Sequence, residues 1–267
     1  MGEFGRQPWN TNFIEEGFQI EERNICSMKV KNILLSILVI ALVIVLEGIV
    51  MGYYQKTIEV VNNPVVTMQL EDYGTVTIEL YPDKAPNTVA NFIKLINDGF
   101  YNGSTFHRAI EGALIQGGAA NGDVSTDDKF AIKGEFFAND FKLNNVRHEP
   151  GVISMARSDY GALSASLTEE GYNSASTQFF IMDETNRNFD GLYCGFGKVI
   201  SGLDIVDKIT KLEKTTDDNG GTTKNLETPV KISQMTVDTF GFNYGEPERN
   251  TTFDYYSWFM KNYTVSN

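Results

Sequence analysis

A long apolar run near the N-terminus sets the first limit on how this chain can fold. Between Ile33 and Met51, only Ser36 and Glu47 are strongly polar. A helix rises about 1.5 Å per residue, so this run would span roughly 28 Å, close to the ~30 Å hydrocarbon core of a bilayer. We therefore predict a single transmembrane helix over residues 33–51, with the rest of the chain folding separately from it.

The charges that flank the run predict its orientation. Arg23, Lys29 and Lys31 precede it, whereas only Lys56 follows shortly after it. Positive charge collects on the cytoplasmic side of membrane spans, so residues 1–32 are expected to be cytoplasmic and the C-terminal part extracytoplasmic. The alternative is a cleaved secretory signal, which would release the C-terminal part as a secreted protein. Both interpretations place that part outside the cytoplasm.

The sequence after the run divides into three parts. Residues 52–66 are typical of a tether and end in a turn-prone Asn-Asn-Pro sequence. Residues 67–247 have the mixed apolar and polar pattern of one globular domain. Residues 248–267 form a tail that is dense in aromatic side chains.

Short β-branched runs of alternating hydrophobicity fill the predicted domain. Two amphipathic helices interrupt them: one opens at Pro86-Asn87-Thr88 with N-cap chemistry and closes at Gly99, and the other covers residues 203–212. Residues 214–227 are interpreted as a polar loop. Many short strands with two helices favour a mainly β fold, a closed antiparallel barrel with capping helices. The strands are expected at residues 65–70, 74–81, 105–109, 114–117, 151–155, 178–182, 194–200 and 230–237.

Charge and composition exclude several classes of function. The net charge is −13, and residues 67–267 hold 17 basic and 28 acidic side chains, so the acidity belongs to the C-terminal part. Nucleic acid is excluded as the principal partner, because neutralising phosphates requires clustered Lys and Arg. The two Cys and two His residues are too few for a disulfide scaffold, a zinc finger or a His-rich metal site. We therefore expect a mechanism without a metal or a cofactor.

Four segments have compositions that core packing does not explain. The first, FHRAIEGALIQGG, begins at Phe106 and places Arg108 and Gln116 on neighbouring predicted strands. The others are GVISMAR from Gly151, STQFFI from Ser176 and FDGLYCGFGKV from residue 189. In this order and at this spacing, the four segments resemble the cyclophilin-type peptidyl-prolyl cis/trans isomerases. The resemblance covers residues 67–244.

The resemblance implies a fold, an activity and two catalytic residues. The family's fold is a closed eight-stranded antiparallel β-barrel capped by two α-helices. Its reaction is the rotation of X–Pro bonds, whose barrier of about 18–20 kcal/mol arises because rotation destroys amide resonance. Arg108 matches the family's catalytic Arg, which donates to the amide nitrogen as that nitrogen becomes basic in the twisted state. Gln116 matches the residue that orients this Arg and contacts the substrate backbone, and no covalent intermediate is required.

The resemblance also implies an apolar pocket for the proline ring. Two positions depart from the family pattern: Ala113 replaces a Phe beside the pocket, and Asn188 stands where cyclosporin-sensitive members have Trp. We therefore expect weak cyclosporin binding. The residues implied for substrate binding are Leu114, Phe180 and Phe189 as pocket walls, Ala113, Ala156, Arg157 and Gln178 beside them, and Tyr193 at the rim.

Two functions follow from these residues. The leading one is a monomeric, membrane-attached isomerase that acts on proline-containing polypeptides and assists the folding of secreted or surface proteins. The alternative is a proline-binding or chaperone module with weak or no turnover. Ala113 favours the alternative, whereas intact Arg108, Gln116 and Phe180 favour the enzyme.

Overall fold

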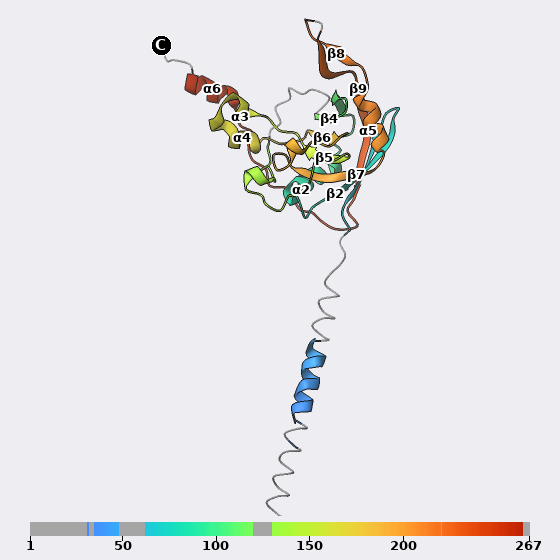
Figure 1. Ribbon diagram of the computed structural model, residues 1–267, viewed down its shortest axis with the longest axis vertical. Coiled ribbons are helices and arrows are strands. Elements are labelled where there is room, and N and C mark those ends of the chain that lie inside the picture. Colours follow the sequence, from blue (N-terminus) through green and yellow to red (C-terminus); the bar gives the residue numbers. More distant parts are fainter. Residues whose placement is uncertain (1–30, 32–34, 48–61, 120–129, 220, 264–267) are drawn as a thin grey trace, which may run out of the picture. The chain divides into compact units, whose positions relative to one another are not determined.

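The computed structural model (Figure 1) describes residues 31, 35–47, 62–119, 130–219 and 221–263. The chain separates into two units, Met1–Val61 and Asn62–Asn267. In the first unit residues 35–47 are helical, and their side chains are exposed. Within the described ranges no helix combines the length and the apolar character needed to cross a bilayer. The predicted transmembrane helix is therefore not supported by the described residues. The other residues of the predicted span lie outside the described ranges. So do most of residues 1–32 and most of the tether.

Eight of the described strands close into a barrel in the second unit. They are β1 (Val65–Leu70), β2 (Gly74–Leu80), β3 (Thr105–Ile110), β4 (Leu114–Ala119), β5 (Val152–Met155), β6 (Phe179–Met182), β7 (Gly195–Ser201) and β9 (Thr222–Asp238). Their order around the sheet is β1-β2-β7-β5-β6-β4-β3-β9, and β1 pairs with β9 to close it. The pairs between these strands are antiparallel. The predicted eight-stranded barrel is therefore confirmed.

The barrel interior is filled by every second residue of the strands, because successive side chains of a strand point to opposite faces. In β1, for example, Val66, Met68 and Leu70 are buried. The two predicted capping helices are present as α2 (Pro86–Asn97) and α5 (Leu203–Thr210). Phe92 of α2 meets the rings of Phe179 and Phe196 with centroids 5.5 and 5.0 Å apart. These contacts join the helix to the strands in one core.

The N-terminus of α2 is capped by a residue far away in the sequence. The helix begins at Pro86 as predicted, but Ala85 at the N-cap position supplies no side-chain hydrogen bond. Instead, the buried carboxylate of Glu135 accepts from the backbone N–H groups of Asn87 and Thr88 at 3.0 and 2.8 Å. A negative charge there also complements the helix dipole. The expected local N-cap chemistry is therefore wrong, and Glu135 performs that function.

Residues 214–216 and 222–227, expected as part of a loop, form the two paired strands of a β-hairpin. β8 (Lys214–Thr216) pairs with the first part of β9 through Lys214–Leu226 and Thr216–Thr222. Figure 1 shows this hairpin projecting beyond the barrel. The interpretation as a loop was wrong because most side chains on both faces are polar and exposed, so the strands show no hydrophobic alternation.

Short helical segments between the strands were not predicted. α3 (Tyr160–Leu163), η3 (Ala165–Leu167) and α4 (Thr168–Tyr172) lie between β5 and β6. η2 (Phe137–Asn139) precedes β5, and η4 (Arg187–Phe189) lies between β6 and β7. These pieces have three to five residues each, which is too short for a helical period to appear in the sequence.

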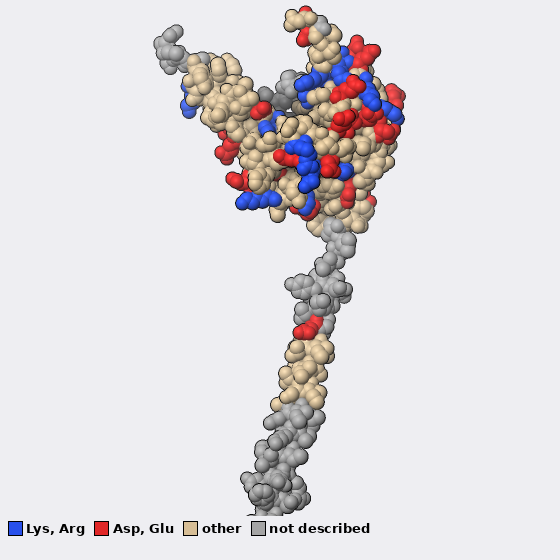
Figure 2. Space-filling model, viewed as in Figure 1, with Lys and Arg blue, Asp and Glu red and all other residues tan. Residues whose placement is uncertain are grey.

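The aromatic tail packs back onto the domain. Glu248 and Asn87 exchange two hydrogen bonds, of 2.7 and 3.0 Å. The Arg249 guanidinium donates to Asn91 Oδ1 and lies 3.8 Å from the centroid of the Phe130 ring. The tail ends in α6 (Tyr255–Tyr263), and Figure 2 shows this helix as a largely uncharged projection beside the charged barrel surface.

Candidate active site

Four paired residues form a row across four strands of the barrel. Arg108 in β3 pairs with Gln116 in β4, Gln116 with Phe180 in β6, and Phe180 with Ser154 in β5. Directly paired residues point to the same face of a sheet. This cross-strand row lies on the outer face, because the neighbours Phe179 and Ile115 belong to the barrel core. The fold therefore brings three of the four sequence segments together on one surface.

The polar end of the cross-strand row is a chain of hydrogen bonds. The Arg108 guanidinium donates to Gln116 Oε1 at 2.9 Å, and Gln116 Nε2 donates to Gln178 Oε1 at 3.1 Å. Burial lowers the pKa of Arg108 below its usual value of 12.5, but a guanidinium remains charged at neutral pH. Among the described residues, Gln116 is its only hydrogen-bond acceptor and no carboxylate forms an ion pair with it. The other guanidinium N–H groups have no protein acceptor among the described residues.

The apolar end is a cluster of side chains separate from the barrel core. The rings of Phe180, Phe189 and Tyr193 meet pairwise, with centroids 5.7, 5.6 and 5.0 Å apart. Edge-to-face and tilted pairs of this kind contribute about 0.5–1.5 kcal/mol each beyond their burial. We call this the outer cluster; its members are Leu114, Val152, Phe180 and Met182, packed by Ile110, Val146, Ala156, Phe189 and Tyr193.

Arg157 is fixed at the edge of the outer cluster. Its guanidinium lies 4.5 Å from the Tyr193 ring centroid and 5.1 Å from that of Tyr172, and Nε donates to the Leu192 carbonyl at 3.2 Å. Cation–π contacts of this type hold the charge in one orientation. Arg157 therefore links the α3–α4 insertion to the rim residue Tyr193.

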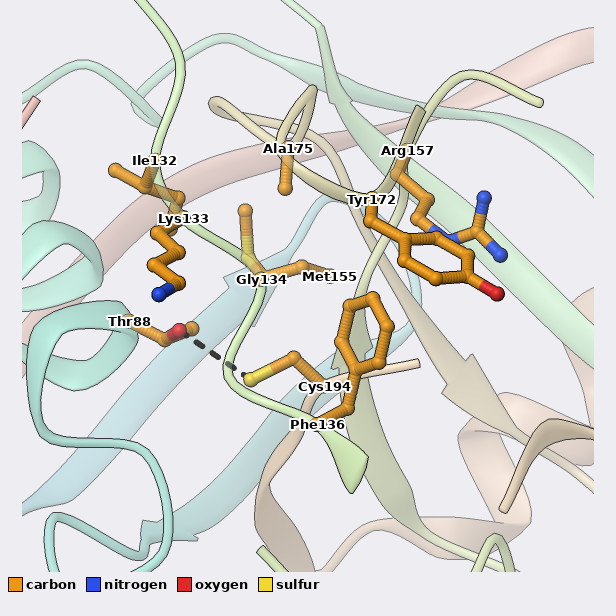
Figure 3. Close-up of a pocket in the computed structure, with 10 residues that line it drawn as sticks. All are labelled: Thr88, Ile132, Lys133, Gly134, Phe136, Met155, Arg157, Tyr172, Ala175 and Cys194. Carbon is orange, nitrogen blue, oxygen red and sulfur yellow. Dashed lines mark hydrogen bonds between the residues drawn. The ribbon is translucent and has the colours of Figure 1, made fainter. Parts of the chain in front are cut away.

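Arg157 also lines a small pocket, which is shown in Figure 3. Its lining includes Met155, Tyr172 and Cys194. The Cys194 sulfur lies 3.3 Å from Thr88 Oγ1, and burial raises the pKa of this thiol to about 12. A thiol with so high a pKa is not a nucleophile at neutral pH. The thiol of this pocket is therefore not a reactive group, and none of the four residues of the cross-strand row lines the pocket.

Two residues singled out in the sequence adjoin members of the outer cluster in the chain without belonging to it. Ala113 is in the turn between β3 and β4, where its carbonyl accepts from the backbone N–H of Asp183 at 2.8 Å. Asn188 is exposed on η4. Neither belongs to the outer cluster. The other site residues predicted from the sequence are brought together.

Two glycines after Gln116 allow the strands to approach closely. A Cβ on Gly117 would lie 2.7 Å from the Thr105 carbonyl oxygen, and one on Gly118 would lie 2.9 Å from that of Thr177. Gly118 also has a backbone φ of +85°, which residues with a side chain rarely adopt. The pair thus serves the packing of β4 against its neighbours, which places Gln116 beside Arg108.

Sequence reasoning missed a buried network beneath the outer cluster. His148 Nδ1 lies 3.2 Å from Asp190 Oδ1, and His148 Nε2 lies 3.1 Å from Ser154 Oγ. The imidazole stacks on Phe180 at 6.1 Å and meets the edge of Phe189 at 5.8 Å. Ser154 and Asp190 lie in two of the quoted segments, but His148 lies outside all four and no spacing pointed to it.

The order Asp190–His148–Ser154 is that of an acyl-transfer triad. His148 and Ser154 are both fully buried, so no substrate can reach the serine hydroxyl. Burial is the main cause that lowers the pKa of His148, which keeps the ring neutral. The network therefore supports the rings of the outer cluster. Within the described ranges, no three His, Cys, Asp or Glu side chains come together as a metal site requires.

Comparisons with known proteins agree with this geometry. The family model "Cyclophilin type peptidyl-prolyl cis-trans isomerase/CLD" matches residues 65–237. Over 136 residues the chain is 40% identical to peptidyl-prolyl cis-trans isomerase B of Bacillus subtilis. The aligned region covers 51% of this chain and 83% of that protein. It is 37% identical over 147 residues to peptidyl-prolyl cis-trans isomerase B of Escherichia coli, covering 52% and 79%.

A solved structure shows the same fold. The cyclophilin-type peptidyl-prolyl cis-trans isomerase of Cryptosporidium parvum has a TM-score of 0.52 at 22% identity, over 66% of this chain and 98% of that one. The chain therefore belongs to the cyclophilin-type peptidyl-prolyl cis-trans isomerases and catalyses the rotation of X–Pro bonds.

Proposed function

We propose that Arg108 lowers the barrier to rotation by donating a hydrogen bond to the nitrogen of the twisted X–Pro amide. Rotation removes conjugation, so this nitrogen gains a basic lone pair in the transition state. A donor that binds the twisted state better than the planar one accelerates the reaction. The observation that supports this role is a half-buried guanidinium that has one protein acceptor and lies on the same face as the outer cluster.

Gln116 and Gln178 fix the position of that guanidinium. Gln116 uses its carbonyl oxygen for Arg108 and its amide group for Gln178, so its orientation is set by two partners. Gln178 is held in turn, because its backbone carbonyl accepts from Ala156 N–H at 2.9 Å. In the proposed mechanism these residues position the donor and need not exchange a proton.

The outer cluster receives the proline ring. Leu114 and Phe180 are 5% and 4% exposed, so they form the floor of this surface next to the polar end of the cross-strand row. The apolar surface open to the ring is that of the partly exposed Phe189 and Tyr193, with Arg157 at the rim. A ring held there would place its nitrogen toward Arg108. The alternative of a binding module without turnover depended on Ala113. Ala113 lies in the β3–β4 turn and is not a member of the outer cluster, and the assay below separates the two functions.

The test is an isomerase assay on residues 62–267 with three variants. Arg108→Ala should lower kcat/KM by about 100-fold, the usual cost of removing one preorganised donor to a transition state. Arg108→Lys should recover little, because an ammonium lacks the planar fork of donors. Lys94→Ala, which removes a positive charge from the surface of α2, should have wild-type activity. An unchanged rate for Arg108→Ala would refute the proposed role.

We further propose that the isomerase domain acts as a monomer outside the cytoplasm on secreted or surface proteins. The support is the apolar run at residues 33–51 and the basic residues before it. Residues 67–267 hold 28 acidic against 17 basic side chains, so anionic headgroups would repel them and the run would have to supply any attachment.

Cell fractionation tests this localisation. The full chain should remain in alkaline-washed membranes, and a chain that lacks residues 33–51 should not. External protease should then digest the domain in intact cells. N-terminal sequencing separates an intact anchor from a cleaved signal. Recovery of the full chain in the cytosolic fraction would contradict the proposal.

A further inference from the structure

The cross-strand row continues past Arg108 onto the β8–β9 hairpin. β9 flanks β3 on the side opposite to β4, and there Arg108 pairs directly with Asn225. Directly paired residues have Cβ atoms about 4.5–5.5 Å apart on one face. Asn225 therefore lies beside Arg108 on the outer face, on the side away from Phe180.

The side chain of Asn225 is exposed and uncommitted. Its backbone N–H donates to Thr223 Oγ1 at 3.1 Å, but its amide group makes no hydrogen bond within the described part of the chain. An Asn side chain offers two donors and an acceptor with two lone pairs. Gln116, on the other side of Arg108, has its carbonyl oxygen and amide group both engaged. The two amides that flank Arg108 thus differ: one orients it and the other faces solvent.

The base of the hairpin is held in place. Leu226, next to Asn225, is buried in the barrel core, and it pairs with Lys214 of β8. The hydroxyl oxygens of Thr215 and Thr223 lie 2.5 Å apart and join the two strands. Asn225 is therefore displayed from a fixed element, which reduces the entropy lost when it binds a ligand.

The face of the hairpin beside Arg108 is polar, and its one charged side chain before Pro229 is that of Glu227, two residues beyond Asn225. Thr223 and Asn225 are two residues apart on one strand, so they share this face, whereas Lys224 points to the opposite one. A peptide backbone presents one N–H and one C=O at almost every residue. Hydroxyl and amide groups match that pattern for many sequences, because they contact the backbone and not particular side chains.

We propose that Asn225 is a substrate-binding residue that hydrogen-bonds the peptide backbone beside the X–Pro bond. The hairpin then extends the site to residues that flank the proline. This inference depends on the proposed role of Arg108, since Arg108 locates the X–Pro bond at that end of the row. Binding through Asn225 is expected for peptides with residues on both sides of the X–Pro pair and not for the isolated pair.

The experiment measures kcat and KM for two substrates by NMR exchange spectroscopy, which needs no coupling protease. One substrate is a capped Ala-Pro dipeptide, and the other has three further residues on each side of Ala-Pro. Asn225→Ala should raise KM for the long peptide about threefold to tenfold, the value of one hydrogen bond, and leave kcat within about twofold. KM for the dipeptide should not change. Lys224→Ala, on the opposite face, is the matched control and should leave both substrates unaffected.

A second variant tests the position of Asn225 directly. Asn225→Asp places a carboxylate beside the guanidinium, and the pair should compete with the substrate for Arg108. We expect kcat to fall at least about tenfold for both substrates, as for loss of a charged hydrogen bond. Because residue 225 is exposed, its substitution should not disturb the fold. Thermal unfolding followed by circular dichroism should therefore give melting temperatures close to that of the wild type.

The outcomes separate this inference from the proposed function. If Asn225→Ala leaves KM for the long peptide unchanged while Arg108→Ala loses activity, the inference is overturned and the role of Arg108 stands. An equal rise in KM for Lys224→Ala would also overturn it, because the effect would then belong to the hairpin as a whole. If Arg108→Ala keeps full activity, the proposed mechanism fails, and the inference fails with it.

Discussion

The two ends of the cross-strand row differ in their surroundings. At the Ser154 end the polar groups are buried and paired, and the rings of Phe180 and Phe189 pack on His148. At the Arg108 end the polar groups are partly exposed, and guanidinium N–H groups remain without a protein acceptor among the described residues. The Ser154 end is completed by folding, whereas in the proposed mechanism the Arg108 end is completed by a substrate. Substitutions at the two ends should therefore separate stability from activity.

The largest expected effect is on stability, at Phe180. This side chain is 4% exposed and contacts Phe189, Tyr193 and His148. Phe180→Ala should lower the free energy of unfolding by about 3–5 kcal/mol, as is usual when a buried Phe is truncated. Equilibrium unfolding of residues 62–267 in urea measures it.

Arg108→Ala is the matched variant for the other end of the row. It removes one partly exposed hydrogen bond, so we expect a stability loss of about 1 kcal/mol or less. Equal losses for the two variants would contradict the distinction between the ends, because they would show that Arg108 is also part of the folded core.

The next largest effect is the loss of stability on removing a buried hydroxyl that has a hydrogen-bond partner, compared with one that has none. Ser154 Oγ meets His148 Nε2 at 3.1 Å, and both residues are fully buried. Ser154→Ala leaves the ring nitrogen without that partner and should cost about 1–3 kcal/mol in urea unfolding.

Ser176 is the control, since it is also buried but its Oγ has no hydrogen-bond partner among the described residues. Ser176→Ala should be neutral or stabilising, because it removes an unsatisfied polar group. The interpretation of the network would be wrong if the two alanine variants had the same stability.

Much of the barrel could be predicted because period-two alternation gives both the strands and their faces. In β6, for example, Phe179 faces the core and Phe180 the outer cluster. The same alternation places Arg108 and Gln116 on one face once their strands pair. The family resemblance, and not the period, identified the role of each residue.

The remainder could not be predicted because it depends on contacts between distant residues. The Glu135 carboxylate caps α2 from 47 and 48 positions away, and His148 reaches Asp190 across 42. No local spacing encodes such contacts. The β8–β9 hairpin was missed for another reason: its strands are polar on both faces apart from Leu226, so the pairing with β3 that brings Asn225 beside Arg108 left no periodic signal.

The smallest expected effect is a pH dependence that comes from His148. Burial is the main cause that lowers its pKa below the ordinary value of about 6.5; the hydrogen bond that His148 donates to Asp190 opposes this, and the charge of Arg187 adds to the lowering. Between the lowered pKa of the folded chain and pH ~6.5, the unfolded chain binds a proton at this residue and the folded chain does not. Stability is therefore fully present above pH ~6.5. It falls as the pH drops toward the lowered folded pKa, by at most about 1.4 kcal/mol per pH unit for one proton.

The measurement compares wild type with His148→Gln in urea at pH 7.5 and pH 5.5. The variant should be less stable at pH 7.5, because it loses the contacts with Ser154 and Asp190. The difference should narrow at pH 5.5, where only the wild type loses stability through this proton. His107, whose pKa burial also lowers, contributes in the same direction in both chains and cancels in the comparison. A difference that widens at pH 5.5 would mean that Asp190 favours a charged imidazolium. The Ser154 end would then hold a buried ion pair. Both ends of the cross-strand row would then contain a positively charged side chain.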